Sequence, residues 1–147
     1  GGDLDNTDYL KMLAPDHFKG CTFYTATSSA MDSELKGSLS SLSGYDNIVV
    51  AIYAKVRYGT GKISISSANI DLVNRLKETG KNLAVISFGN PYLLKEFPTT
   101  PSYICAYGDS DFSIKAALKA ITGAVKFKGK LPVTISEDHK YGTSIIK

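Results

Sequence analysis

The chain has 147 residues, a net charge of +3 and a pI of about 8.8. Its composition, 43% hydrophobic and 21% charged, excludes an intrinsically disordered protein and allows a buried core. No apolar stretch approaches the ~18 residues of a membrane-spanning helix, and the mild positive charge does not indicate a nucleic-acid partner.

The first third of the chain predicts a helix, a strand and a second helix. Apolar residues at Tyr9, Leu10 and Leu13 predict a short helix that Pro15 ends. The β-branched and aromatic residues of 21–27 predict a strand. A second helix is predicted by one apolar face, which consists of Met31, Leu35, Leu39 and Leu42.

The rest of the chain alternates between strands and helices. Continuous apolar runs predict strands at 47–54, 82–88 and 102–107, covered on both faces. Helical periods predict one helix that Ser67 caps and Gly80 ends, and another from about Asp111 to Gly123. A last strand is expected at 130–135, and Pro132 would place it at an edge of the sheet. This order predicts an α/β fold: a three-layer sandwich whose mostly parallel sheet has helices on both faces.

The start of the chain does not fit this pattern, because α/β domains normally open with a strand. We expect a single domain over 1–147, with residues 1–3 as a processing scar or truncation start and 138–147 as a tail. The chain would then be a fragment. Its leading strand would be missing, or another segment would fill that strand's place.

The loops after the strands are the candidate binding rim, because ligands of parallel α/β sheets lie at the carboxyl ends of the strands. The sequence around Gly61-Lys62 lacks the first glycine and the hydroxyl residue of a phosphate-binding loop. With two histidines, at 17 and 139, neither a catalytic triad nor a metal site is expected. Asp109 and Asp111 are expected to cap a helix rather than to act as a catalytic pair. Cys21 and Cys105 are expected to be buried free thiols, and a disulfide between them stays open.

Several stretches together resemble the C-terminal α/β domain of glycoside hydrolase family 3. They lie in the same order and spacing and cover roughly residues 20–136. They are residues 45–52 (YDNIVVAI), 69–81, 85–94 (VISFGNPYLL) and 103–135. The last stretch includes AYGDS at 106–110 and GKLPVTI at 129–135.

The resemblance implies an exo-glycosidase whose upstream (β/α)8 barrel holds the sugar and the nucleophilic Asp. In β-glucosidase members a Glu acid/base stands in the loop that matches 55–64, and this loop has no Asp or Glu here. The resemblance therefore favours the β-N-acetylglucosaminidase type, in which this domain supplies no catalytic group. Arg57, Tyr58 and Asn90 would border the substrate, and neither a cofactor nor a metal is implied.

By family resemblance the parent protein would be exported or periplasmic, and its partners would be the barrel and a carbohydrate. The chain alone is expected to hydrolyse nothing. The alternative is a flavodoxin- or receiver-like binding module for a nucleotide, a phosphate or a protein. Asp46 and Asp109 are too isolated for the acidic cluster of a receiver.

Overall fold

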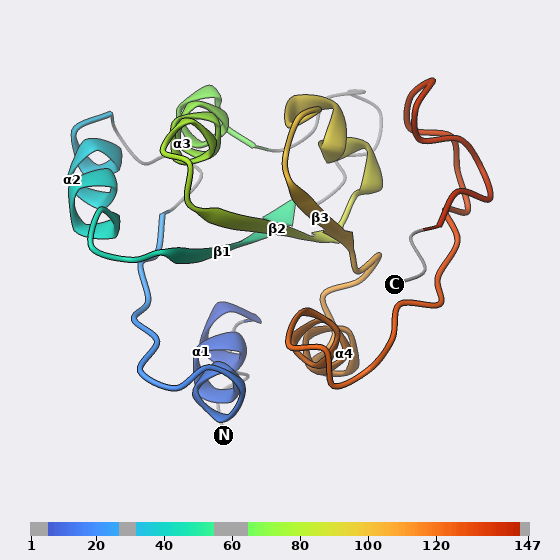
Figure 1. The fold of residues 1–147 in the computed structure, drawn as a ribbon, viewed down its shortest axis with the longest axis horizontal. Coiled ribbons are helices and arrows are strands. Elements are labelled where there is room, and N and C mark those ends of the chain that lie inside the picture. The colour runs from blue at the N-terminus through green and yellow to red at the C-terminus, as the bar shows by residue number, and fades with distance from the viewer. Residues whose placement is uncertain (1–5, 27–31, 55–64, 145–147) are drawn as a thin grey trace. The chain divides into compact units, whose positions relative to one another are not determined.

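The computed structural model describes residues 6–26, 32–54 and 65–144 (Figure 1). The chain forms two compact units. One is continuous, Tyr24–Tyr107, and the other combines Gly1–Phe23 with Gly108–Lys147. No helix in the described ranges has the length and hydropathy needed to cross a membrane.

The continuous unit contains a parallel sheet of three strands, β1 (Asn47–Ala54), β2 (Asn82–Gly89) and β3 (Ser102–Cys105), in the order β1-β2-β3. The three predicted inner strands are therefore confirmed. β3 ends two residues earlier than predicted, and Tyr107 has a left-handed backbone with φ 60°. A parallel sheet with helices makes the chain a small α/β sandwich, as predicted.

The core of this unit lies on one face of the sheet. Figure 1 shows α2 (Asp32–Leu42), α3 (Ser67–Glu78) and the 3-10 helix η1 (Pro91–Glu96) above that face. Alternate strand residues point toward them, because side chains on a strand alternate between faces. The buried members of this core are Ile48, Ala54, Val73, Leu76, Leu83, Val85, Leu93 and Phe97.

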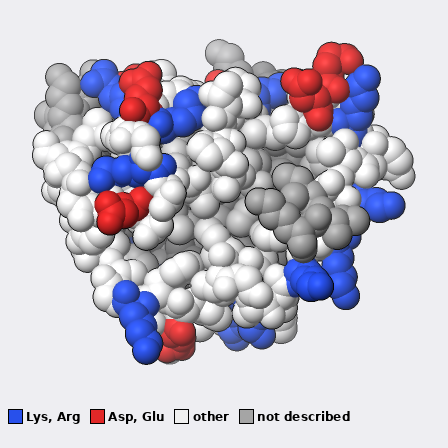
Figure 2. Space-filling model, viewed as in Figure 1, with Lys and Arg blue, Asp and Glu red and all other residues white. Residues whose placement is uncertain are grey.

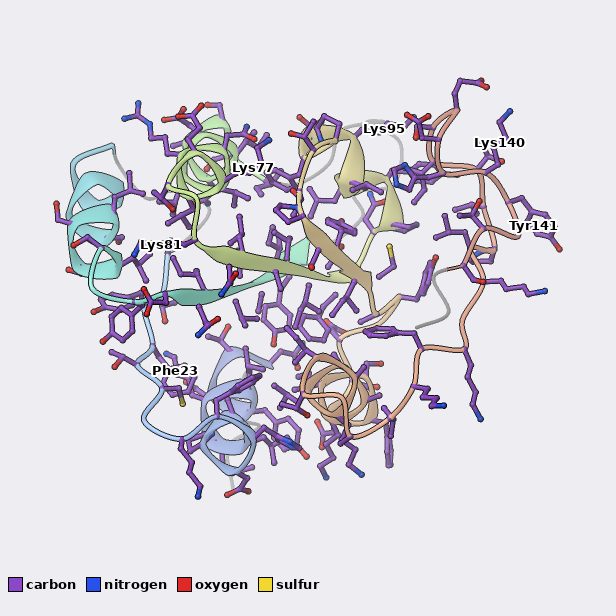
Figure 3. The ribbon with its side chains drawn as sticks, in the orientation of Figure 1. Phe23, Lys77, Lys81, Lys95, Lys140 and Tyr141 are labelled. Carbon is purple, nitrogen blue, oxygen red and sulfur yellow. The ribbon has the colours of Figure 1, made fainter. Side chains whose placement is uncertain are left out.

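A lysine just before β2 forms hydrogen bonds with the backbone that follows α2. Lys81 donates from Nζ to the carbonyl oxygens of Ser43 (2.8 Å) and Tyr45 (2.6 Å), just beyond α2 (Figure 3). A cation at this position also complements the negative end of the helix dipole. The amino ends of β1 and β2 are joined by a side-chain bond from Asn82 to Asn47 of 2.9 Å.

The cap of α3 is one residue earlier than predicted. The hydroxyl of Ser66, not Ser67, accepts the backbone N–H of Asn69 at 3.3 Å. The helix ends near Gly80 as expected, with φ 72° at that glycine. Such a left-handed residue closes helices commonly, and glycine adopts it without a steric penalty.

We expect Ser66→Ala to lower the free energy of unfolding by about 1 kcal/mol, since the first turn of α3 loses its side-chain acceptor. Ser67→Ala is the matched control and should change stability by less than about 0.5 kcal/mol, because alanine is a better helix former and the cap stays in place. Urea unfolding of the two variants measures the difference. Equal losses would show that Ser66 does not cap the helix.

The second unit contains α1 (Asn6–His17) and α4 (Asp111–Ile121), which pack against each other. Asn6 donates to the Asp109 carboxylate at 2.8 Å, and the Lys115 ammonium lies 5.6 Å from the centroid of the Tyr9 ring. The prediction that Pro15 ends α1 is wrong, because the helix continues to His17. A proline this close to a helix end removes one backbone bond, and the Phe18 N–H still reaches the Ala14 carbonyl at 2.8 Å.

Two predicted strands do not form. Residues 21–26 of the predicted strand 21–27 are irregular, and all but Cys21 are exposed. Their β propensity has no ladder to join, since none of the described strands pairs with them. Residues 130–135, the expected edge strand, are irregular as well. Their backbone bonds are local, from Leu131 to Thr143 (2.8 Å) and from Ile135 to His139 (2.8 Å). Pro132 removes one donor that a ladder would need.

Candidate functional site

The carboxyl end of β2 is a tight turn at Gly89-Asn90-Pro91. Gly89 has φ 121°, which is open to glycine almost alone, and a Cβ there would lie 3.1 Å from the Ala54 carbonyl oxygen. β1 and β2 therefore approach each other closely where they end. Of the three predicted substrate-bordering residues, Asn90 lies in this turn, while Arg57 and Tyr58 fall outside the described residues.

Asn90 is held in place through both its side chain and its backbone. Its Oδ1 accepts the Tyr92 N–H at 2.9 Å and caps η1. Its carbonyl oxygen accepts the hydroxyl proton of Ser87 at 2.9 Å. Ser87 is the one buried polar residue of the described core, so its bond to Asn90 explains how a hydroxyl is accommodated there. With Oδ1 engaged, the Nδ2 group of Asn90 keeps its two protons for a ligand.

An exposed aromatic ring stands beside Asn90. Tyr92 is 39% exposed, and the Lys95 ammonium lies 5.3 Å from the centroid of its ring. Lys95 comes from the last turn of η1 (Figure 3). The turn thus presents an amide donor, an aromatic ring and a cation within six residues. These groups can bind a polar, uncharged or weakly anionic ligand.

The neighbouring strand, β3, carries a tyrosine with a buried hydroxyl group. Tyr103 on β3 has a buried hydroxyl oxygen with no hydrogen-bond partner among the described residues. Burial raises the pKa of Tyr103 well above its ordinary value, and the nearby Ser87 hydroxyl offsets only part of that shift. Ser87 donates its own proton to the Asn90 carbonyl oxygen, so toward the Tyr103 hydroxyl it can act only as an acceptor. Tyr103 is not among the residues predicted to border a ligand, although the alternation in 102–107 places it on the same face as Cys105.

Replacing Tyr103 by Phe is expected to increase stability, because it removes a buried hydroxyl that lacks a bond. The gain near pH 8 should be about 1 kcal/mol. Because the pKa of Tyr103 is higher in the folded than in the unfolded state, wild-type stability should fall as the pH rises above about 10. The phenylalanine variant lacks that contribution, so its advantage should grow with pH. Urea unfolding at pH 8 and pH 11 measures both effects, and a loss of stability at pH 8 would mean that the hydroxyl has a partner.

The end of β3 adds a thiol and a second tyrosine. Burial raises the pKa of Cys105, and burial together with Cys105 raises the pKa of Tyr107 to about 12. Both groups are therefore neutral at pH 7, and neither is an activated nucleophile. Cys21 and Cys105 are free, as expected, although both are half-buried rather than fully buried.

The carboxylates that follow β3 have structural roles. Asp109 accepts the bond from Asn6, and Ser110 rather than an aspartate caps α4 by accepting the Ser113 N–H at 3.4 Å. The expectation that Asp109 caps this helix is therefore wrong. Asp111 stands in the first turn of α4, where a negative charge is favourable. Within the described residues, no group of three His, Cys, Asp or Glu side chains is placed to hold a metal ion.

Charged side chains on the surface form small groups that combine acidic and basic residues. Lys140 pairs with Glu137 at 3.2 Å, and Arg75 pairs with Asp71 at 2.7 Å. On the face drawn in Figure 2, acidic side chains lie next to basic ones. Exposed pairs of this kind add about 0–1 kcal/mol each and do not define a binding site.

Comparison with known proteins gives one match. The glycosyl hydrolase family 3 C-terminal domain matches residues 7–144. No curated protein and no solved structure matches the chain. The matched range includes all the described helices and strands except the first residue of α1, and it includes the turn at Asn90. The chain therefore belongs to the glycosyl hydrolase family 3 C-terminal domain family, and it is an accessory domain of a protein of that family.

Proposed function

We propose that the chain is the non-catalytic accessory domain of a family 3 exo-glycosidase of the β-N-acetylglucosaminidase type. It would pack against the catalytic barrel of the parent protein and border the sugar site. The type of sugar and the contact with the barrel are what we propose. The family assignment itself rests on the match over residues 7–144.

The observation that carries the proposal is the lack of a carboxylate where a glycosidase would need one. Retaining hydrolysis uses two carboxyl groups, and one must protonate the leaving oxygen. At the ends of the three strands the described residues carry no carboxyl group, namely Ala54, Gly89, Asn90, Ala106 and Tyr107. The next carboxylate after β3, that of Asp109, is bonded to Asn6. The sequence of 55–64 also contains no Asp or Glu. Both catalytic carboxyl groups would then come from the barrel.

Asn90 is the residue through which this domain would touch the sugar. Its free Nδ2 protons can be donated to a sugar hydroxyl or to the carbonyl oxygen of an acetamido group. The hydrogen bonds from Tyr92 and Ser87 fix its orientation before a ligand arrives, which lowers the entropic cost of binding. Arg57 and Tyr58 are proposed to complete this border.

The proposal is tested with the purified chain in two assays. First, p-nitrophenyl N-acetylglucosaminide and p-nitrophenyl glucoside should show no turnover above the buffer rate. Second, in NMR titrations N-acetylglucosamine should shift the side-chain amide signals of Asn90 more than glucose does. Asn90→Ala should abolish the shifts of neighbouring amides, and Asn82→Ala, at the opposite end of β2, should not.

The outcomes separate the parts of the proposal. Turnover of either glycoside would overturn the non-catalytic role. Shifts at Asn90 with phosphate or ADP, but with neither sugar, would favour the nucleotide- or phosphate-binding alternative. Co-purification with the separately expressed barrel of the parent protein tests the packing, and two unassociated proteins would contradict it.

A further inference from the structure

The short helix η1 has one exposed side, and this side begins next to Asn90. A 3-10 helix has three residues per turn, so side chains three positions apart lie in line along it. Leu94 is in line with Phe97, the residue that follows η1, and both side chains are buried. Tyr92 is in line with Lys95, and both of these are exposed. The apolar residues therefore hold η1 against the core, while Tyr92 and Lys95 face outward.

Lys95 places a positive charge on this exposed side. Its Nζ lies 5.3 Å from the centroid of the Tyr92 ring, which is a cation–π contact. Among the described residues Lys95 has no carboxylate partner. The adjacent acidic residue, Glu96, is in line with buried Leu93 and not with Lys95. The charge of Lys95 is therefore available to a ligand.

Asn90 and Lys95 are both placed against Tyr92. The Oδ1 atom of Asn90 accepts the Tyr92 N–H at 2.9 Å, and the Lys95 ammonium lies at the Tyr92 ring. The Nδ2 group of Asn90 and the ammonium group of Lys95 can only donate hydrogen bonds. A carboxylate only accepts them, and its single negative charge equals the charge of one lysine. A phosphate monoester carries nearly two negative charges and would need a second cation.

We propose that this border binds a sugar unit that bears one carboxylate, as a uronic acid does. The inference rests on the proposed function, which places a sugar at Asn90. Asn90 donates from Nδ2 to a hydroxyl group of the sugar, and Lys95 binds the carboxylate. Tyr92 positions Lys95, because the cation–π contact keeps the ammonium group beside the turn.

The test compares methyl β-D-glucuronide with methyl β-D-glucoside, which differ only in the carboxylate or hydroxymethyl group at C6. Titrations of the purified chain, followed by NMR at the Asn90 side-chain amide, give the two dissociation constants. At low salt the glucuronide should bind about three- to fivefold more tightly, as expected of an exposed charge pair. Because salt screens exposed charges, about 0.5 M NaCl should remove most of this preference.

Three variants assign the preference to one side chain. Lys95→Gln removes the charge, so the ratio of the two dissociation constants should fall to about one. Lys95→Arg keeps the charge and should keep the preference. Lys77→Gln is the matched control: it removes the same charge from the last turn of α3, which leads to the amino end of β2, opposite Asn90 (Figure 3). This variant should also keep the preference.

Equal affinity of the wild-type chain for the two glycosides would overturn the inference, and so would a preference that survives Lys95→Gln. If acetate or inorganic phosphate shifted the Asn90 signals at the same concentrations as the glucuronide, the site would bind anions without a sugar, which also contradicts it. Binding of N-acetylglucosamine at Asn90 without a preference for the glucuronide would remove this inference and leave the proposed function standing. Failure of all three sugars to shift the Asn90 signals would contradict both.

Discussion

Phe97→Ala is expected to lower the free energy of unfolding by about 3–5 kcal/mol, the largest loss among the substitutions considered. Phe97 follows η1, is fully buried, and belongs to the same core as Val85 and Leu93. Its N–H is bonded to the Leu94 carbonyl at 3.0 Å, so the backbone is fixed there and the surroundings have little freedom to fill the space left by the ring. Urea unfolding followed by circular dichroism measures the change.

Phe112→Ala is the matched control for this experiment. Phe112 stands in the first turn of α4 and is 83% exposed, so removing its ring should change stability by no more than about 0.5 kcal/mol. Similar losses for the two variants would mean that Phe97 is not part of a packed core. A domain of marginal stability could lose most of its folded population through Phe97→Ala alone.

Gly89→Ala is expected to be the second most damaging change. A side chain at φ 121° costs about 1–3 kcal/mol, and the added Cβ would also press on the Ala54 carbonyl oxygen, 3.1 Å away. Because Asn90 is the next residue, the strain should also displace the turn that positions its amide. Thermal unfolding reports the loss of stability, and the Asn90 amide signals report the displacement.

Gly80→Ala separates the cost of a left-handed backbone from the cost of the close contact that an added Cβ makes at position 89. Gly80 also has a positive φ, 72°, but a Cβ there would meet no atom within 4 Å. Its substitution should cost about 1–2 kcal/mol, the ordinary penalty for alanine in the left-handed region. If Gly80→Ala were as harmful as Gly89→Ala, the close approach of β1 and β2 would have no energetic weight.

The sequence predicted well those elements whose signal is local. The apolar runs of β1 and β2 are eight residues long and contain β-branched residues, which is typical of buried strands, and the period of α4 is regular. It failed where the outcome depends on a partner. Residues 21–26 have the composition of a strand but no described ladder to join, and 130–135 bond to a nearby loop instead.

In the candidate site, too, the sequence predicts the features with a local signal and misses those that depend on a neighbouring strand. Asn90 could be predicted, because Pro91 forces a turn at the end of an apolar run and ligands gather at such ends. The bond from Ser87 to Asn90 and the unpartnered hydroxyl of Tyr103 depend on how β2 and β3 lie side by side. No pattern within one strand reports that arrangement. The cap at Ser66 was missed by one residue because two serines stand together and both could accept the bond.

One unit is continuous in sequence and the other combines two distant segments, and this difference determines the order in which they can form. β1 and β2 join residues 35 positions apart, whereas the Asn6–Asp109 bond between the α1 and α4 segments joins residues 103 positions apart. Closing the longer loop costs about 1 kcal/mol more in chain entropy, and no local contact offsets this beforehand. The sheet of the continuous unit can therefore assemble early, while the helix pair must wait for the two ends of the chain to meet. During synthesis on the ribosome, α1 would leave the exit tunnel before α4 and remain without its helical partner until α4 had been made.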